Sequence, residues 1–253
     1  MPLPARPDAA RIRYSAGMVD TTISELEWQA LRVSCAVAWR SAVYSLPLAI
    51  AVAWALTRRR FVGRFALDAL IHLPLVLPPV LIGYGLLLLF GIHGPIGAWL
   101  QKHFDIRLVF SLQGAALASA VMTFPLLVRS IRIALEHVDQ GLEEAARTLG
   151  AGALDRFVTI TLPLMSPGVL AGAITAFVAA LGEFGAIITF AGNVPGETQT
   201  LPLALYSALQ RVDGDALAGR LALISLGIGT AGLALAEFAN HGLRRLLGRP
   251  GTN

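Results

Sequence analysis

The chain has 253 residues, of which 55% are hydrophobic and 14% are charged. Soluble globular domains carry about 25% charged residues, so this composition argues against a soluble domain and predicts a membrane protein. The formal net charge is +4, but nearly all basic residues are arginines beside apolar segments, which is typical of membrane topology signals and not of nucleic-acid binding. With Cys35 as its single cysteine, the chain cannot form an internal disulfide or a cysteine-based metal site.

Five apolar segments are long enough to cross a membrane, whose hydrocarbon core takes about 20 helical residues. They cover residues 33–56, 67–90, 110–128, 164–190 and 217–238. The second contains Pro74, Pro78 and Pro79 and is expected to be kinked, since membrane helices tolerate proline. The sequence therefore predicts an all-α polytopic protein in contact with membrane lipid.

The ends of the chain differ from this apolar part. Residues 1–22 contain arginines but lack the apolar core of a signal peptide, and we interpret them as a flexible extension. A transmembrane domain is expected over residues 23–240, followed by a cytoplasmic tail over residues 241–253. An additional membrane-surface helix over residues 23–32 remains an alternative for the start of the domain.

Arginines are concentrated in alternate loops, which sets the orientation. The arginine-rich segments are the loop after the first span, the segment between the third and fourth spans, and the tail. This pattern predicts an external N-terminus and a cytoplasmic C-terminus. In the last external loop, Leu201, Leu205 and Leu209 recur at helical spacing and predict a short surface helix over residues 202–210.

A compact charged segment, "EEAARTLG", covers residues 143–150 of the loop that is expected to be cytoplasmic. Its apolar residues share one helical face: Leu142, Ala145, Ala146 and Leu149. Glu143 and Arg147 have the favourable i,i+4 order, and Gly150 is a typical helix stop. A second short helix is expected over residues 153–161, ended by Pro163.

So short a helix pair cannot bury its own apolar face and needs a partner surface. That surface is either the protein's own membrane domain or another protein. The sequence by itself leaves both alternatives open.

The order Glu144-Ala145-Ala146, Gly150 and "ITLP" at residues 160–163 resembles the EAA motif of membrane permease subunits of bacterial ABC importers. The resemblance extends from about Trp28 to the last span. It implies the type I importer permease fold, with coupling helices in the loop 139–163 that dock into a groove on a separate ATPase. The residues that it assigns to coupling are Glu144, Ala145, Ala146, Gly150, Ile160, Leu162 and Pro163.

Three stretches narrow the resemblance to the molybdate permeases and, more distantly, the sulfate permeases. They cover residues 73–91, 145–152 and 181–206. This branch implies import of molybdate across the inner membrane, with sulfate or tungstate as the alternative. It also implies a homodimer, an ATP-binding ABC subunit and a periplasmic molybdate-binding protein, with the N-terminus periplasmic.

The residues themselves provide no machinery for ATP hydrolysis or other catalysis. A phosphate-binding loop needs a GK[ST] sequence, but the only lysine, Lys102, follows Gln101. The histidines are scattered and none has metal-ligand spacing, so we expect no catalytic residue, metal or cofactor in this chain. The resemblance assigns ATP and Mg to the partner ATPase. A secondary carrier or a membrane enzyme is the alternative of a different class, but the chain lacks internal repeats and a clustered catalytic set.

Polar residues inside the spans are candidates for the translocation path, because an oxyanion needs hydrogen-bond donors. They are Thr123, Ser166, Thr175, Gly182, Glu183, Gly185 and Thr189. Arg40 and Glu183 lie at similar depth and could form a pair. Alternatively, Arg40 extends toward the membrane surface and Glu183 caps a local break in the backbone. Asp68 and His72, at i,i+4, are interpreted as an interfacial pair.

Overall fold

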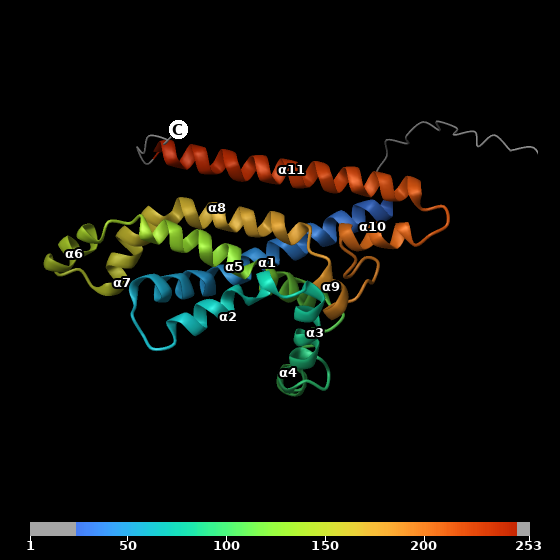
Figure 1. Cartoon of the computed structure of the whole chain (residues 1–253), viewed down its shortest axis with the longest axis horizontal. Helices are drawn as coiled ribbons and strands as arrows, with labels where there is room; N and C mark the ends of the chain where they lie inside the picture. The colour runs from blue at the N-terminus through green and yellow to red at the C-terminus, as the bar shows by residue number, and fades with distance from the viewer. Residues whose placement is uncertain (1–23, 247–253) are drawn as a thin grey trace, which may run out of the picture.

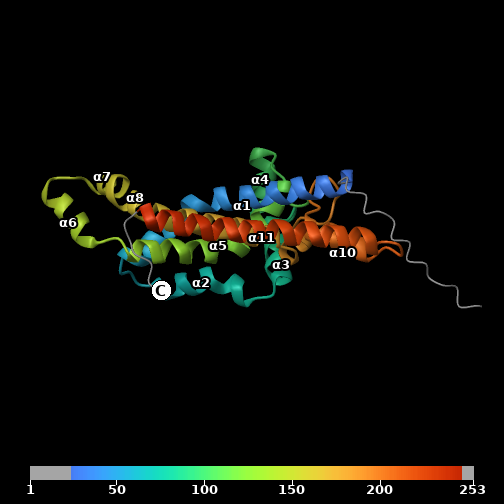
Figure 2. The ribbon, with the colours of Figure 1, turned by 90° about the horizontal axis from the view of Figure 1, so that it is seen from above.

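The computed structural model describes residues 24–246, with side chains up to residue 238. The predicted extension at residues 1–22 and the last part of the predicted tail, residues 247–253, lie outside the described residues. Four long helices run side by side along the long axis of the molecule (Figures 1 and 2). They are α1 (Glu25–Arg58), α5 (Leu112–Glu136), α8 (Leu162–Leu181) and α11 (Asp215–Leu246). No strand occurs in the described part of the chain, as expected for an all-α protein.

Helix α1 begins earlier than the first apolar segment suggests. Ser24 caps it by accepting a hydrogen bond from the amide of Glu27, while the Glu27 carboxylate accepts one from the amide of Ser24. This capping box starts one continuous helix, so the alternative of a separate surface helix over residues 23–32 is wrong. Small residues such as Ala38, Ala42 and Ala49 form its buried face, which allows close approach of α5 and α8.

The second apolar segment is more than kinked. It forms two helices, α2 (Arg64–Val76) and α3 (Pro79–Phe90), bent by 118° at the break between them. The break follows from Pro78 and Pro79, because a residue before proline avoids the helical region and Leu77 is extended at φ −79° and ψ 147°. Pro74 stays inside α2. Figure 1 shows α3 and α4 (Pro95–Phe104) projecting from the bundle.

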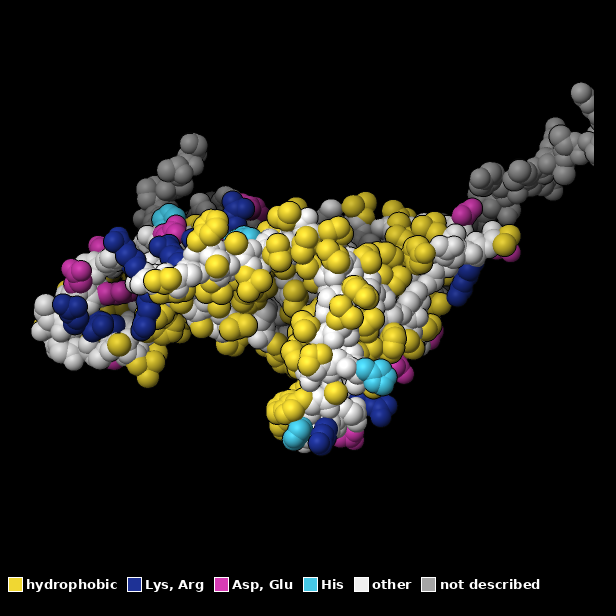
Figure 3. All heavy atoms as spheres, turned by 60° about the horizontal axis from the view of Figure 1, so that its bottom comes forward, with side chains coloured by type: hydrophobic (Ala, Val, Ile, Leu, Met, Phe, Trp, Pro, Cys, Tyr) yellow, Lys and Arg dark blue, Asp and Glu magenta, His cyan; other side chains and the backbone are white. Residues whose placement is uncertain are grey.

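The bundle thus contains four helices that are long and apolar enough to cross a membrane, or five spans if the bent pair α2–α3 is one of them. Hydrophobic side chains cover the middle of the face drawn in Figure 3, and charged side chains gather at the α6–α7 end and at the tip of the α4 projection. This distribution is the one expected for a protein whose middle contacts lipid.

The end of the bundle where α1 begins is closed by two short helices, α9 (Gly185–Phe190) and α10 (Leu201–Leu209). The short helix predicted for residues 202–210 is therefore present. It packs against α1 and α11 through Leu201, Ala204 and Ala208, whereas the predicted apolar residue Leu209 is 62% exposed.

The opposite end carries α6 (Gln140–Thr148), α7 (Ala153–Arg156) and a π-helical turn, Phe157–Thr161. Pro163 was expected to end the second short helix, but this expectation is wrong. The backbone stays helical from Ala153 to Leu181, with Pro163 directly after the π-helical turn Phe157–Thr161 as the second residue of α8. The segment "ITLP" is thus the helical connection from α7 into α8.

Candidate functional site

The segment that carries the motif, residues 139–163, projects from one end of the bundle (Figures 1 and 2). Asp139 caps α6 through its side chain, which accepts a hydrogen bond from the amide of Gly141 at 2.8 Å. At the other end, Gly150 takes φ +91° and its amide bonds to the carbonyl of Arg147, while Ala151 bonds back to Ala146. These two bonds form a Schellman motif, which turns the chain sharply toward α7.

The apolar face predicted for α6 is not covered by the part of the chain that the structure describes, residues 24–246. Leu149 is 88% exposed, Leu142 is 48% exposed, and α6 has no buried residue. Leu154 on α7 is 76% exposed beside them. Of the two alternatives left open by the sequence, packing against the chain's own membrane domain is therefore wrong for this face. It is free to contact another molecule.

Glu143 is the exception on α6, because its side chain points toward the bundle. Its Oε1 atom accepts a hydrogen bond from Oγ1 of Thr161 at 2.7 Å and lies 3.4 Å from Nη2 of Arg58. The predicted partner of Glu143 was Arg147, one turn along α6, and this expectation is wrong. Arg58 is within reach of Glu143 and is less exposed to water than Arg147.

Arg58 is the last residue of α1, and its side chain is only 10% exposed. Besides Glu143, Nη2 also lies 3.4 Å from the carbonyl oxygens of Leu135 and Val138, at the end of α5. Carbonyls at a helix C-terminus lack intrahelical partners and carry partial negative charge, which favours a guanidinium there. Sequence reasoning missed this role, because Arg58 lies in a run of arginines that was interpreted only as a topology signal.

A groove of about 820 Å³ lies beside this contact, between the C-terminal half of α1 and the α6–α7 segment. Its walls include Ile50 and Trp54 from α1, Leu154 and Phe157 from the α7 side, and the Glu143–Thr161 pair. Arg59 stacks on the Trp54 ring at 4.9 Å. The groove is mainly apolar, apart from the charges at its end.

The polar residues predicted for a translocation path are not brought together. The hydroxyls of Thr123, Ser166, Thr175 and Thr189 each donate to a backbone carbonyl of their own helix, three or four residues earlier. Gly185 packs against Pro79 of α3, where a Cβ atom would lie 2.7 Å from the proline ring, and Gly182 ends α8. None of the seven candidates lines one of the four described cavities.

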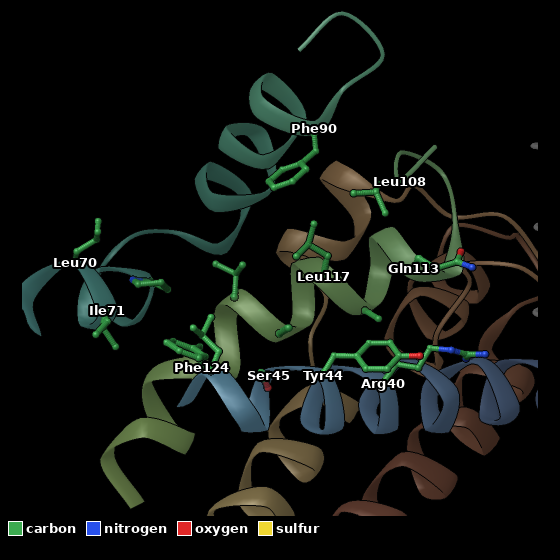
Figure 4. Close-up of a pocket in the computed structure, with 15 residues that line it drawn as sticks. Arg40, Tyr44, Ser45, Leu70, Ile71, Phe90, Leu108, Gln113, Leu117 and Phe124 are labelled. Carbon is green, nitrogen blue, oxygen red and sulfur yellow. The ribbon is translucent and has the colours of Figure 1, made fainter. Parts of the chain in front are cut away.

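The possible pair between Arg40 and Glu183 does not form in the described structure. The Glu183 carboxylate accepts a hydrogen bond from the amide of Ala186 at 3.0 Å, so it caps the break between α8 and α9. Arg40 instead lines a cavity of about 580 Å³, on which side chains from α1, α2, α3 and α5 converge (Figure 4). Tyr44, Ser45 and Gln113 are the other polar residues that line this mostly apolar cavity.

Asp68 and His72 are indeed adjacent, with the His72 Nδ1 atom 3.5 Å from the carboxylate. The stronger contact of Asp68, however, is with Arg132 on α5, at 2.6 Å. Asp68 therefore ties α2 to α5, which the i,i+4 spacing could not reveal because the partner is 64 residues away.

Comparison with known proteins identifies relatives over most of the chain. Residues 45–245 match the family described as "Binding-protein-dependent transport system inner membrane component". The molybdenum transport system permease protein ModB of Escherichia coli (strain K12) is 49% identical over 227 residues, which cover 90% of this chain and 99% of that protein. The sulfate transport system permease protein CysT of the same organism is 39% identical over 184 residues, 73% of this chain and 66% of that protein.

A solved structure shares the fold at low sequence identity. A chain of a bacterial alginate ABC transporter, in complex with an alginate pentasaccharide-bound periplasmic protein, superposes with a TM-score of 0.67. The two chains are 20% identical, and the match covers 90% of this chain and 82% of that one. The all-α polytopic fold expected from the sequence is confirmed.

Proposed function

The chain belongs to the family of binding-protein-dependent transport system inner membrane components, and we propose that it carries molybdate across the inner membrane as the permease subunit of an ABC importer. It is a multi-pass protein of that membrane and a non-catalytic component of its transport system. The observation that carries the choice of molybdate is the 49% identity to a molybdenum permease over nearly the full length of both chains. The 39% identity to a sulfate permease makes sulfate the second candidate.

The α6–α7 segment is the proposed contact with a separate ATP-binding subunit. The support for this role is its exposed apolar face, including Leu142, Leu149 and Leu154, on a segment that projects from the bundle. Glu144 and Ala145 are exposed on the same helix, and Gly150 sets the turn that presents it. The residues proposed for coupling are Glu144, Ala145, Ala146, Gly150, Ile160, Leu162 and Pro163.

The remaining partners and the orientation complete the proposal. Two copies of the chain form the pore, a periplasmic molybdate-binding protein delivers the anion, and the ATPase binds and hydrolyses ATP with Mg. The N-terminus is periplasmic and the α6–α7 end is cytoplasmic, which agrees with the arginines gathered near Arg58 and Arg132 at that end. A translocation path along the seven residues named from the sequence stays a prediction. They are Thr123, Ser166, Thr175, Gly182, Glu183, Gly185 and Thr189.

Uptake into proteoliposomes tests the substrate. The permease is reconstituted with its ATPase, and external binding protein and internal ATP are supplied. We expect uptake of labelled molybdate that needs all components and is blocked by excess tungstate, with sulfate a much weaker competitor. Uptake of sulfate in preference to molybdate would replace the proposed substrate, and molybdate uptake by the permease without an ATPase would contradict the ABC mechanism.

A further inference from the structure

We propose that Arg58, Glu143 and Thr161 form the linkage that transmits movement of α6 to the membrane helices during transport. This inference rests on the proposed function, in which an ATPase docks on α6. The three residues come from three places in the chain: the end of α1, the middle of α6, and the last residue before α8. They meet at a single carboxylate oxygen, Oε1 of Glu143.

The first argument is that the side chains of α6 make few contacts with the rest of the described structure. None of its residues is buried, and it packs chiefly against α7 and the π-helical turn. Within the described residues, the hydrogen bonds from α6 side chains to other elements are those of Glu143. A force applied to α6 therefore reaches the bundle along the chain, through residues 137–139 to α5 and through α7 to α8, and through this carboxylate, which is its side-chain link to α1.

The second argument is that the linkage is connected to three membrane helices at once. Arg58 belongs to α1 and its Nη2 atom also bonds to carbonyls at the end of α5. Thr161 is 2% exposed and immediately precedes α8. A shift of Glu143 thus acts on α1 and α5 through the guanidinium of Arg58 and on α8 through the hydroxyl of Thr161. These bonds form one contiguous network, which is the kind of structure that carries coupling between distant sites.

The third argument concerns the local state of these groups. Nε of Arg58 is buried and has no hydrogen-bond partner, and the bonds from Nη2 are long, at 3.4 Å. Nε of Arg58 is therefore available to donate a hydrogen bond when Glu143 moves. Thr161 ends a π-helical turn, a type of local widening that is often found at functional sites of helices.

The adjacent carboxylates of Glu143 and Glu144 accordingly have different roles. Glu144 is exposed, so an ATPase surface can reach it. Glu143 faces the protein's own helices. Glu143 and Arg58 are thus positioning residues: they connect the docking helix to the helices that open and close the pore.

The test uses the complete transporter in proteoliposomes and separates docking from transmission. The variants are Glu143→Gln, Thr161→Val and Thr161→Ser, with Glu136→Gln as the matched control because Glu136 is an exposed acid at the end of α5. Three quantities are measured: the amount of ATPase that co-purifies, the stimulation of ATP hydrolysis by loaded binding protein, and the molybdate imported per ATP.

We expect Glu143→Gln and Thr161→Val to retain ATPase within about twofold while molybdate imported per ATP falls about tenfold, because the first removes the charge of the shared acceptor and the second removes the hydroxyl that donates to it. Thr161→Ser keeps the hydroxyl and should behave as the wild type, as should Glu136→Gln. In a double-mutant cycle, Glu143→Gln combined with Thr161→Val should be little worse than either alone.

Two results would overturn the linkage. One is normal import per ATP in both Glu143→Gln and Thr161→Val, and the other is loss of the co-purifying ATPase in these variants, which would make Glu143 a docking residue. Failure of the proposed function is distinguishable, because the wild-type permease would then neither retain an ATPase nor import molybdate. If Glu143→Gln fails to fold, the linkage is tested by comparing Thr161→Val, which loses the hydroxyl at nearly the same shape, with Thr161→Ser, which keeps the hydroxyl.

Discussion

Nη2 of Arg220 on α11 lies 2.8 Å from Oε2 of Glu27 on α1, and the Glu27 side chain is fully buried. The two residues are 193 positions apart, so this contact fastens the last helix of the bundle to the first. α11 also packs along α8 and α10, but many of its apolar side chains, such as Leu223 and Leu233, face outward. The ion pair is therefore an important polar attachment of α11.

Replacing Arg220 with methionine should destabilise the permease by about 2–3 kcal/mol, since Glu27 would keep a buried charge without its cationic partner. The loss is smaller than for a fully buried ion pair because Arg220 itself is partly exposed. Thermal unfolding in detergent would show this as a lower midpoint. Arg211→Met, which removes an arginine from an exposed turn, is the control and should leave the midpoint unchanged. Equal midpoints for the two variants would show that the pair does not hold α11.

The close packing of α3 against α9 leads to a second prediction. A Cβ atom at Gly83 would lie 2.7 Å from the carbonyl oxygen of Ala186, whereas a Cβ at Gly85 would meet nothing within 4 Å. Gly83→Ala should destabilise the protein by about 1–3 kcal/mol, because the backbones must separate. Gly85→Ala should be neutral or slightly stabilising, since alanine favours a helix interior. Thermal midpoints that rank the two variants the other way would contradict this account of the α3–α9 contact.

Gly150 supplies the third prediction, through its positive φ of +91°. Gly150→Ala should cost about 1–2 kcal/mol in local strain and misplace the turn between α6 and α7. We expect weaker binding of the ATPase and reduced molybdate uptake, measured by co-purification and by transport. Gly152→Ala is the matched control two residues along, because Gly152 has φ −67° and open space around its Cβ position. Similar losses in both variants would exclude the backbone conformation of Gly150 as the cause.

Leu149 provides a fourth prediction, which tests the docking surface itself. Because Leu149 is 88% exposed, Leu149→Asn should change the stability of the isolated permease by less than about 0.5 kcal/mol. If an ATPase covers this face, the same change should weaken its association by about tenfold, as loss of an apolar anchor in an interface does. Val212→Asn, at a 98% exposed position at the other end of the bundle, is the control. Unchanged ATPase affinity for Leu149→Asn would remove this residue from the interface.

Much of the molecule follows from the sequence because it depends on local or compositional signals. Runs of apolar residues about 20 long predict helices in a membrane, where every backbone amide must be bonded within its own segment. The helix at residues 140–148 and its stop at Gly150 follow from periodicity and from the freedom of glycine at positive φ. The motif around Glu144 and the family it indicates could also be found without coordinates, and both the family and the fold are confirmed.

Only the tertiary structure decided which charges meet. Glu143 contacts Arg58 and Thr161 and not Arg147, and Asp68 contacts Arg132, because packing brings these residues of different elements within hydrogen-bond distance. The 118° bend after α2 was also decided by the tertiary structure. The prolines mark where the helix breaks, but the packing of α3 on α9 sets the direction in which α3 continues. Spacing along one helix predicts partners within that helix; contacts between residues 85 or 193 positions apart depend on how whole helices pack.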